Sequence, residues 1–289
     1  MRRTWTDGAD GWVANEAIFD AVFAPVTAAI LDAAGLARGQ RVLDVGCGTG
    51  TLLAAGAAAG ADVVGIDISP AMADGARRRV PAATLVVGDA QTAKLLDEAP
   101  GSPFDRVVSR FGVMFFADPA AAFANIRQAT APGARMVFVC WRDAAENPMF
   151  TVGTSVLVDR LEVKPELPVS GEPGPTAFAD RARLVGLLAE AGWDPAISPL
   201  DVECDYGTGD SGTGERATGG SDGVEERLAT ILSTTTGRNA RAELEPALGA
   251  AGWAALLEDV RAELREYVVD GSVRFPGAMW LVTATNPGQ

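Results

Sequence analysis

The sequence predicts an α/β fold built on a mainly parallel sheet, and three observations support this prediction. Five short apolar runs rich in β-branched residues follow one another along the first half of the chain. Alanine-rich or amphipathic segments separate them. The runs are continuous rather than alternating, which is typical of strands buried on both faces. The predicted strands are "RVLDVG" (41–46), "DVVGID" (62–67), "ATLVVG" (83–88), "FDRVVS" (104–109) and "RMVFVCW" (135–141).

Capping signals agree with helices between these strands. Ser69 and Asp118 each precede a proline, so a capping side chain is followed by a residue suited to the first turn of a helix. Further along, "RARLVGLLAEAGW" (181–193) has the spacing of an amphipathic helix. The remaining predicted elements are a strand around 196–204, helices at about 224–234 and 253–268, and a final strand at 277–285.

Two regions interrupt this alternation. Residues 142–179 carry five prolines and predict a long connection with one helix. Residues 207–223 are rich in glycine and nearly free of apolar residues, which favours a flexible surface loop over a phosphate-binding loop. The expected segments are an N-terminal helical lid (1–35), an α/β core (36–205, with an insertion around 142–179), a loop and helical cap (206–270), and a last core strand with the C-terminus (271–289).

The composition argues against several classes of partner. With 38 acidic and 24 basic side chains, the 289-residue chain has a formal net charge of −14. This charge opposes binding to nucleic acid or to the anionic face of a membrane. No run of 18 apolar residues predicts a spanning helix. The three cysteines are far apart, which predicts neither a disulfide framework nor a metal site and favours a reduced, cytoplasmic location.

Histidine is absent from the chain. The side chain that most often transfers protons near neutral pH is therefore missing, and triads that depend on histidine are excluded. Any reaction must need little proton transfer or must use Asp, Glu, Tyr or water.

The stretch "RVLDVGCGTGTLL" (41–53) places glycines at alternate positions where the first strand meets a helix. A dinucleotide fingerprint has a third glycine at the position of Thr51. Asp44 discriminates more strongly, because a carboxylate beside the turn repels a pyrophosphate and attracts a cation. A sulfonium ion with a neighbouring ammonium group is such a cation. The alternative is that Asp44 only caps the local turn.

Two further acids follow the next strands. Asp67 ends the second strand and can accept hydrogen bonds from both hydroxyls of a ribose, while Asp89 follows the third and can accept from an adenine amino group. Because open α/β sheets bind ligands at the carboxyl ends of their strands, this order fits a nucleoside laid across that edge. For Asp89 the alternative is a cap for a helix that begins at Gln91.

With "VLDVGCGTG", "GIDIS", "VVGDA" and "FDRVVSRFGVMFFADP" in this order, residues 36–141 resemble the class I S-adenosylmethionine-dependent methyltransferases. The chain looks most similar to the small-molecule branch, which includes ubiquinone, menaquinone and natural-product methyltransferases. The resemblance implies a Rossmann-like, doubly wound sheet of seven strands with the last one antiparallel, and S-adenosyl-L-methionine as cofactor. It also implies that Gly46 and Gly48 admit the methionine part, Asp67 binds the ribose, and Asp89 and Ala90 lie at the adenine. The predicted cofactor residues are Asp44, Gly46, Cys47, Gly48, Asp67, Ile68, Met72, Asp89, Ala90, Ser109 and Arg110.

Apolar and aromatic residues gather where the substrate pocket is expected. The candidate lining residues are Trp12, Phe111, Met114 and Trp141. Such a pocket suits a small, planar or lipophilic acceptor. Arg110 either pairs with an acidic group of the substrate or with a neighbouring aspartate. The sequence does not decide whether Glu16, Asp118, Tyr206 or no residue acts as the catalytic base. It also leaves open whether the protein is a monomer or a homodimer.

Three functions compete. The first is transfer of a methyl group to O, N or C of a small acceptor by direct displacement, in which positioning supplies about 7–11 kcal/mol of the barrier reduction. The second is a protein that binds the same cofactor but acts as a cyclase or decarboxylase. The third is a nicotinamide-dependent oxidoreductase, against which Asp44 and Thr51 argue.

Overall fold

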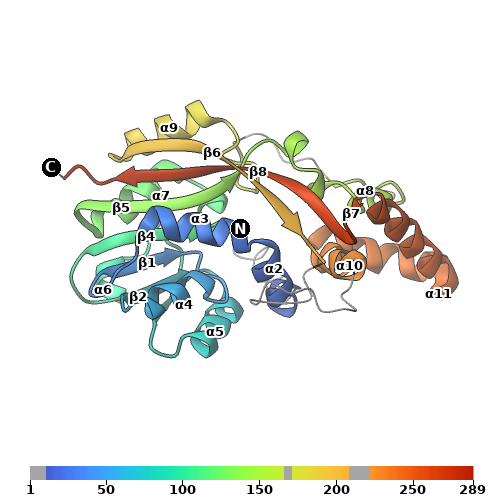
Figure 1. The fold of residues 1–289 in the computed structure, drawn as a ribbon, viewed down its shortest axis with the longest axis horizontal. Coiled ribbons are helices and arrows are strands. Elements are labelled where there is room, and N and C mark those ends of the chain that lie inside the picture. Colours follow the sequence, from blue (N-terminus) through green and yellow to red (C-terminus); the bar gives the residue numbers. More distant parts are fainter. Residues whose placement is uncertain (1–10, 166–170, 208–221, 289) are drawn as a thin grey trace.

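The computed structural model describes residues 11–165, 171–207 and 222–288. An eight-stranded sheet forms the core: seven strands follow the order β3-β2-β1-β4-β5-β8-β6, and the eighth, the short strand β7, pairs with β8 outside this order (Figure 1). Strands β1 to β5 are parallel, and β8 runs antiparallel between β5 and β6. The strands are β1 Arg41–Val45, β2 Asp62–Asp67, β3 Thr84–Val87, β4 Phe104–Arg110, β5 Thr130–Trp141, β6 Asp194–Asp205, β7 Val268–Val269 and β8 Ser272–Thr285.

The α/β fold class with one antiparallel strand is confirmed, but the count of seven strands is wrong. The eighth strand, β7, forms a hairpin with the start of β8, in which Val269 pairs with Ser272. Asp270 and Gly271 between them have φ of 51° and 77°. This left-handed pair is typical of the tight two-residue turn that Asp-Gly favours, so the sequence carried the signal for the extra strand.

Helices cover both faces of the sheet, as a doubly wound sheet requires. α3 and α4 pack on one face, and α7 and α9 pack together on the other (Figure 1). Ser69 and Asp118 cap α5 and α7 by accepting hydrogen bonds from Met72 and Ala121, as predicted. The helices are α2 Glu16–Val22, α3 Ala24–Ala34, α4 Thr51–Ala58, α5 Pro70–Arg79, α6 Leu95–Glu98, α7 Pro119–Gln128, α8 Thr154–Val158, α9 Arg181–Glu190, α10 Val224–Ser233 and α11 Thr235–Arg265, with short 3-10 turns at Val113–Phe115, Ala144–Glu146 and Pro148–Phe150.

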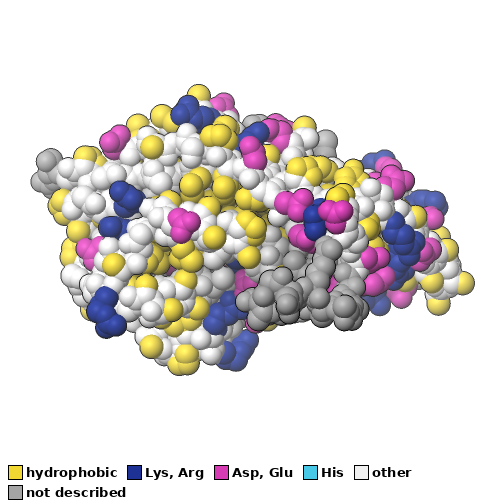
Figure 2. All heavy atoms as spheres, viewed as in Figure 1, with side chains coloured by type: hydrophobic (Ala, Val, Ile, Leu, Met, Phe, Trp, Pro, Cys, Tyr) yellow, Lys and Arg dark blue, Asp and Glu magenta, His cyan; other side chains and the backbone are white. Residues whose placement is uncertain are grey.

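A two-stranded ribbon extends the sheet toward a group of helices. β8 pairs with β6 from Arg274 to Thr285 but reaches β5 only from Met279 onward, so its first half continues past the core with β6 alone. At the end of this ribbon lie α8, α10 and α11, which we call the cap (Figure 1). Acidic and basic side chains are interspersed on its visible face (Figure 2). They form ion pairs such as Arg261 with Glu225.

The helix predicted at 253–268 is longer and begins at Thr235. The run before Gly249 was not predicted, and the run after it contains the predicted helix; Gly249, with a non-helical φ of 69°, forms the kink between them. In the insertion at 142–179, α8 is joined by two 3-10 turns. The first ten residues of the predicted lid and most of the predicted glycine-rich loop at 207–223 lie outside the described residues.

Within the described part of the chain, no single helix is long and apolar enough to cross a membrane. The pair formed by α2 and α3 reaches the required length and composition but is bent by 65°. Phe19 and Val22 of α2 and Ile30 of α3 are buried in the core.

Candidate functional site

The glycine turn after β1 brings two loops together and leaves one side open. Gly46 and Gly48 have φ of 67° and 53°, which only glycine adopts without strain. A Cβ on Gly46 would lie 2.7 Å from the Cα of Gly112, so the turns after β1 and β4 touch there. A Cβ on Gly48 would meet no atom within 4 Å. The turn therefore has room for a ligand beside Gly48.

Asp44 is a buried carboxylate without a partner. Its side chain lies in β1 with 1% exposure, and neither oxygen accepts a hydrogen bond within the described structure. Burial raises the pKa of Asp44 to about 8, with the charge of Arg110 opposing and that of Asp67 adding to the rise. The alternative of a turn cap is not supported, because a cap would accept a backbone hydrogen bond. A buried carboxylate of this kind is stabilised by a cationic ligand.

Asp67 ties the end of β2 to the glycine turn. Its two oxygens accept hydrogen bonds from the backbone N–H of Gly48 at 2.9 Å and of Ser69 at 2.8 Å. Burial raises the pKa of Asp67, although these hydrogen bonds oppose the rise. Each carboxylate oxygen can accept a second hydrogen bond, so the residue keeps capacity for ligand hydroxyls.

Cys47 holds the turn through its backbone rather than through its thiol. Its N–H and that of Gly46 both donate to the carbonyl of Ile66, at 3.1 and 2.9 Å. Burial raises the pKa of the Cys47 thiol, which keeps the thiol protonated and unreactive. Ile68 follows β2 and is half-buried, while Met72 is buried in the first turn of α5.

Asp89 contacts its neighbour Gln91 in a turn; the next helix, α6, begins only at Leu95, so Asp89 does not cap a helix that begins at Gln91. Its carboxylate accepts hydrogen bonds from the backbone N–H and the side-chain amide of Gln91, each at 3.0 Å. The carbonyl of the buried Ala90 accepts a hydrogen bond from Asn125 at 2.9 Å, which fixes this turn to α7.

Ser109 and Arg110 make their contacts within the protein. The Ser109 hydroxyl donates to the carbonyl of Val45 at 2.7 Å and accepts from the N–H of Gly112 at 3.2 Å, so it joins the turns after β1 and β4. Arg110 donates to the carboxylate of Asp20 at 3.0 Å and to the hydroxyl of Thr27 at 2.9 Å. Of the two sequence alternatives for Arg110, pairing with a neighbouring aspartate is the one observed.

Asp20 joins α2 to the core, and sequence reasoning missed it. Its carboxylate also accepts from the Thr51 hydroxyl at 2.6 Å and pairs with Arg79 at 2.7 Å. Burial acts to raise the pKa of Asp20, but the hydrogen bond from Thr51 and the charge of Arg110 lower it overall. The N-terminal helix is therefore anchored beside the start of α4, where the glycine turn ends.

Six aromatic rings form a continuous series next to this turn. Phe111 and Trp141 stack with ring centroids 4.9 Å apart, and Phe23 meets both edge-on. Phe111 follows β4 with φ of 66°, a conformation that is strained for a bulky side chain and common at functional sites. We call this series the ring cluster; its members are Trp12, Phe19, Phe23, Phe111, Trp141 and Phe150.

The sequence predicted half of the ring cluster. Trp12, Phe111 and Trp141 belong to it, whereas Met114 is buried in a 3-10 turn and its carbonyl accepts a hydrogen bond from Gly174. The spacing of Phe19 and Phe23, four residues apart on one helix face, was an available signal for two more members. Phe150 lies in the irregular insertion and carried no such signal.

The three candidate bases all have structural contacts. Glu16 lies 3.6 Å from Arg79, and Asp118 caps α7. Tyr206 is buried beside Arg227, and burial raises its phenol pKa, which opposes a role as base at neutral pH. No group of three metal-binding side chains occurs in the described ranges.

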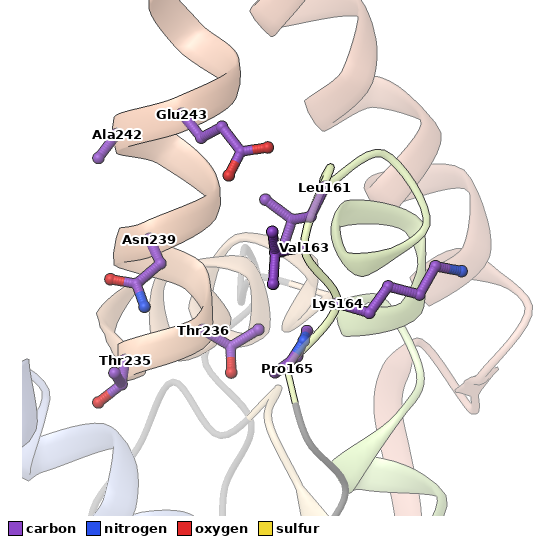
Figure 3. A pocket seen from close by; sticks show the side chains of 9 residues that line it. All are labelled: Leu161, Val163, Lys164, Pro165, Thr235, Thr236, Asn239, Ala242 and Glu243. Atoms are coloured by element: carbon purple, nitrogen blue, oxygen red, sulfur yellow. The ribbon is translucent and has the colours of Figure 1, made fainter.

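A pocket of about 720 Å³ lies on the cap, between the segment after α8 and the first turns of α11. Thr236 and Glu243 of α11 face Leu161 and Val163 across it (Figure 3). The pocket contains none of the residues predicted from the sequence.

Comparisons with known proteins identify the family of this chain. Residues 42–133 match the family described as "Methyltransferase domain". A demethylmenaquinone methyltransferase of Renibacterium salmoninarum is 32% identical over 174 residues, which are 57% of this chain and 70% of that protein. An uncharacterized protein of Mycobacterium tuberculosis is 28% identical over 193 residues, 65% of either chain.

Solved structures share the fold at low sequence identity. The YcgJ protein of Bacillus subtilis is 13% identical with a TM-score of 0.53, over 91% of this chain and 98% of that one. The [4+2]-cyclase SpnF is 20% identical with a TM-score of 0.51, over 92% of this chain and 82% of that one. Of the three functions that competed on sequence, the methyltransferase is confirmed by the family match and the curated relative. The chain belongs to the class I S-adenosylmethionine-dependent methyltransferases, in the branch that methylates small molecules.

Proposed function

We propose that S-adenosylmethionine binds along the carboxyl ends of β1, β2 and β3, with its cationic methionine part beside Asp44. The unpartnered, fully buried carboxylate of Asp44 carries this proposal, because a cation supplies the charge that the site lacks. The open side of the turn at Gly48 gives the ligand room. Asp67 accepts the ribose hydroxyls with its remaining lone pairs, and Asp89 with Ala90 lies at the adenine.

Other predicted residues act by positioning. Ser109 holds the two turns together, Arg110 anchors α2 through Asp20, and Cys47 fixes the turn through its N–H. Ile68 and Met72 pack beside the adenosine.

When bound, the cofactor supplies a methyl group on a positively charged sulfur, which an acceptor atom displaces directly. The chain contributes alignment and the exclusion of water, and no histidine or metal is needed for these tasks. We propose that an aromatic acceptor lies against the stacked Phe111 and Trp141, because this pair offers a flat apolar surface one residue from Gly112, which touches the glycine turn. The relative named demethylmenaquinone methyltransferase supports an acceptor of this apolar kind. The three free, buried cysteines support a cytoplasmic location.

Calorimetric titration with S-adenosylhomocysteine, S-adenosylmethionine and NADH tests the cofactor. We expect micromolar binding of the two adenosyl compounds by the wild type, a loss of at least tenfold in Asp67→Ala, and no binding of NADH. Tight binding of NADH alone, or adenosyl binding that Asp67→Ala leaves unchanged, contradicts the proposal.

A further inference from the structure

Arg227 of α10 is a charged side chain buried in the cap. It is 6% exposed, and its guanidinium donates to the carbonyl of Met149, to the Thr230 hydroxyl at 3.2 Å and to the Tyr206 hydroxyl at 3.4 Å. The Nε atom has no acceptor within the described structure. Since a guanidinium has five N–H donors, these contacts leave part of its capacity unused.

None of the hydrogen-bond acceptors of Arg227 carries a negative charge. Within the described ranges, no carboxylate lies within 4.0 Å of its guanidinium. Burial raises the phenol pKa of Tyr206, so this neighbour stays neutral. Arginine keeps its proton at any ordinary pH, and a buried charge without an opposite charge is costly. The rings of Tyr206 and Phe275, whose centroids lie 5.4 and 5.6 Å from the guanidinium carbon, compensate part of this charge. No anion compensates the rest.

Arg227 adjoins the ring cluster through the insertion. Its acceptor Met149 precedes Phe150, whose ring lies 5.0 Å from that of Trp141. Asn147 fixes this segment, because its side-chain amide donates to the carbonyl of Ala278 at 3.1 Å and accepts from the N–H of the same residue at 2.8 Å. Arg227 therefore contacts, through Met149, the segment that carries Phe150, the ring of the cluster that lies beyond Trp141.

We propose that Arg227 binds a carboxylate on the aromatic acceptor, so that the acceptor is an aromatic acid whose ring lies on the ring cluster. This inference rests on the proposed function, since it places the acceptor beside Phe111 and Trp141. The carboxylate supplies the missing charge and accepts from donors such as Nε. In this arrangement the cap selects the acceptor by its carboxylate, and the glycine turn binds the cofactor.

The experiment uses hydroxybenzoic and hydroxynaphthoic acids, each paired with its carboxamide. Each compound is titrated into full-length protein saturated with S-adenosylhomocysteine. We expect at least one acid to bind tenfold to hundredfold more tightly than its amide, as charge-assisted hydrogen bonds predict. In Arg227→Gln this preference disappears, while the affinities for the amide and for S-adenosylhomocysteine stay within twofold.

Control variants separate recognition from folding. Arg261→Gln removes a guanidinium on α11 that pairs with Glu225 on the cap surface, and it keeps the preference for acids. If Arg227→Gln does not fold, Arg227→Lys, which keeps the charge, retains part of the preference and serves in its place. The proposal is overturned if no acid binds the wild type more tightly than its amide, or if Arg227→Gln keeps the preference for the acid. It is also overturned if Arg227→Gln lowers the affinities for acid and amide by the same factor. Failure of S-adenosylhomocysteine to bind the wild type instead contradicts the proposed function.

Discussion

The core and the cap each bury a charged side chain that lacks an opposite charge, and the two differ in how they tolerate it. Asp44 in the core can take up a proton, and its pKa of about 8 keeps it mostly neutral at pH 7 in the free protein. Arg227 in the cap keeps its charge, which three neutral hydrogen-bond acceptors and the rings of Tyr206 and Phe275 stabilise.

Because of this difference, the core end of the proposed site, at Asp44, and its cap end, at Arg227, respond differently to a ligand. The core end switches its charge when a cation binds, so cofactor binding is coupled to protons. The cap end presents a constant positive charge, so acceptor selection depends on the acceptor's own ionisation.

Replacement of the core carboxylate has the largest effect. Asp44→Asn keeps the size of the side chain but removes its ability to become negative, so we expect the affinity for S-adenosylmethionine to fall at least a hundredfold. Without ligand, the variant is more stable than the wild type above pH 3.8. In the unfolded wild type Asp44 loses its proton above this pH, whereas in the folded protein burial keeps it protonated up to about pH 8, and this difference favours unfolding. The contribution of Asp44 to wild-type stability is therefore lost as the pH rises from 3.8 to about 8, so the stability of the wild type falls more steeply with pH than that of the variant, which keeps only the smaller effect of Asp67.

Chemical unfolding of both proteins between pH 5 and pH 9 measures this difference. A variant with wild-type affinity for the cofactor, or with the same pH dependence of stability, contradicts the role of Asp44.

The pH dependence of cofactor binding tests the proton switch without a mutation. Since the cation needs an ionised Asp44, affinity rises up to tenfold per pH unit below about pH 8 and levels off above it. Binding also releases close to one proton at pH 7. Titrations in buffers of different ionisation enthalpy measure that proton, and a flat profile from pH 6 to pH 9 excludes the switch.

The sequence predicted the core end well because its signals are local. A strand, a glycine turn and a helix are adjacent in the chain, so Asp44 and Asp67 were recognisable from short patterns. The same local patterns predicted the fold class, which the sheet topology confirms, and the methyltransferase family, which the family match and the relative confirm. The Asp-Gly hairpin at Asp270 was equally local, and its omission explains the wrong strand count.

The cap end was not predictable for the opposite reason. Arg227 donates a hydrogen bond to the carbonyl of Met149, which is 78 positions away in the chain. No periodicity connects residues so far apart; only the folded chain does. A buried arginine inside an amphipathic helix also looks, in sequence, like any solvated charge on its polar face.

Phe111 belongs to the ring cluster, and its side chain contacts Phe23 and Trp141. Phe111→Leu removes the stacked ring beside Trp141, so the affinity for the neutral hydroxynaphthamide probe falls about threefold to tenfold, as expected for loss of one aromatic pair. The affinity for S-adenosylhomocysteine and the ratio between acid and amide both stay unchanged. Titration of the variant with the hydroxynaphthamide, the corresponding acid and S-adenosylhomocysteine measures these affinities. If Phe111→Leu also lost the preference for the acid, ring binding and carboxylate binding would not be independent, contrary to our description.

The smallest effect concerns the anchor of α2. Asp20→Asn removes the partner of Arg110, whose charge is then less compensated and opposes a cationic ligand near Asp44. We expect S-adenosylmethionine to bind about twofold to fivefold more weakly and S-adenosylhomocysteine, which lacks the sulfonium charge, to lose less. Glu16→Gln on the same helix is the matched control, because its carboxylate lies 3.6 Å from Arg79 and is more exposed, and a pair of this kind contributes little. Equal losses for both ligands would show that Asp20 holds the helix in place without affecting the charge at Asp44.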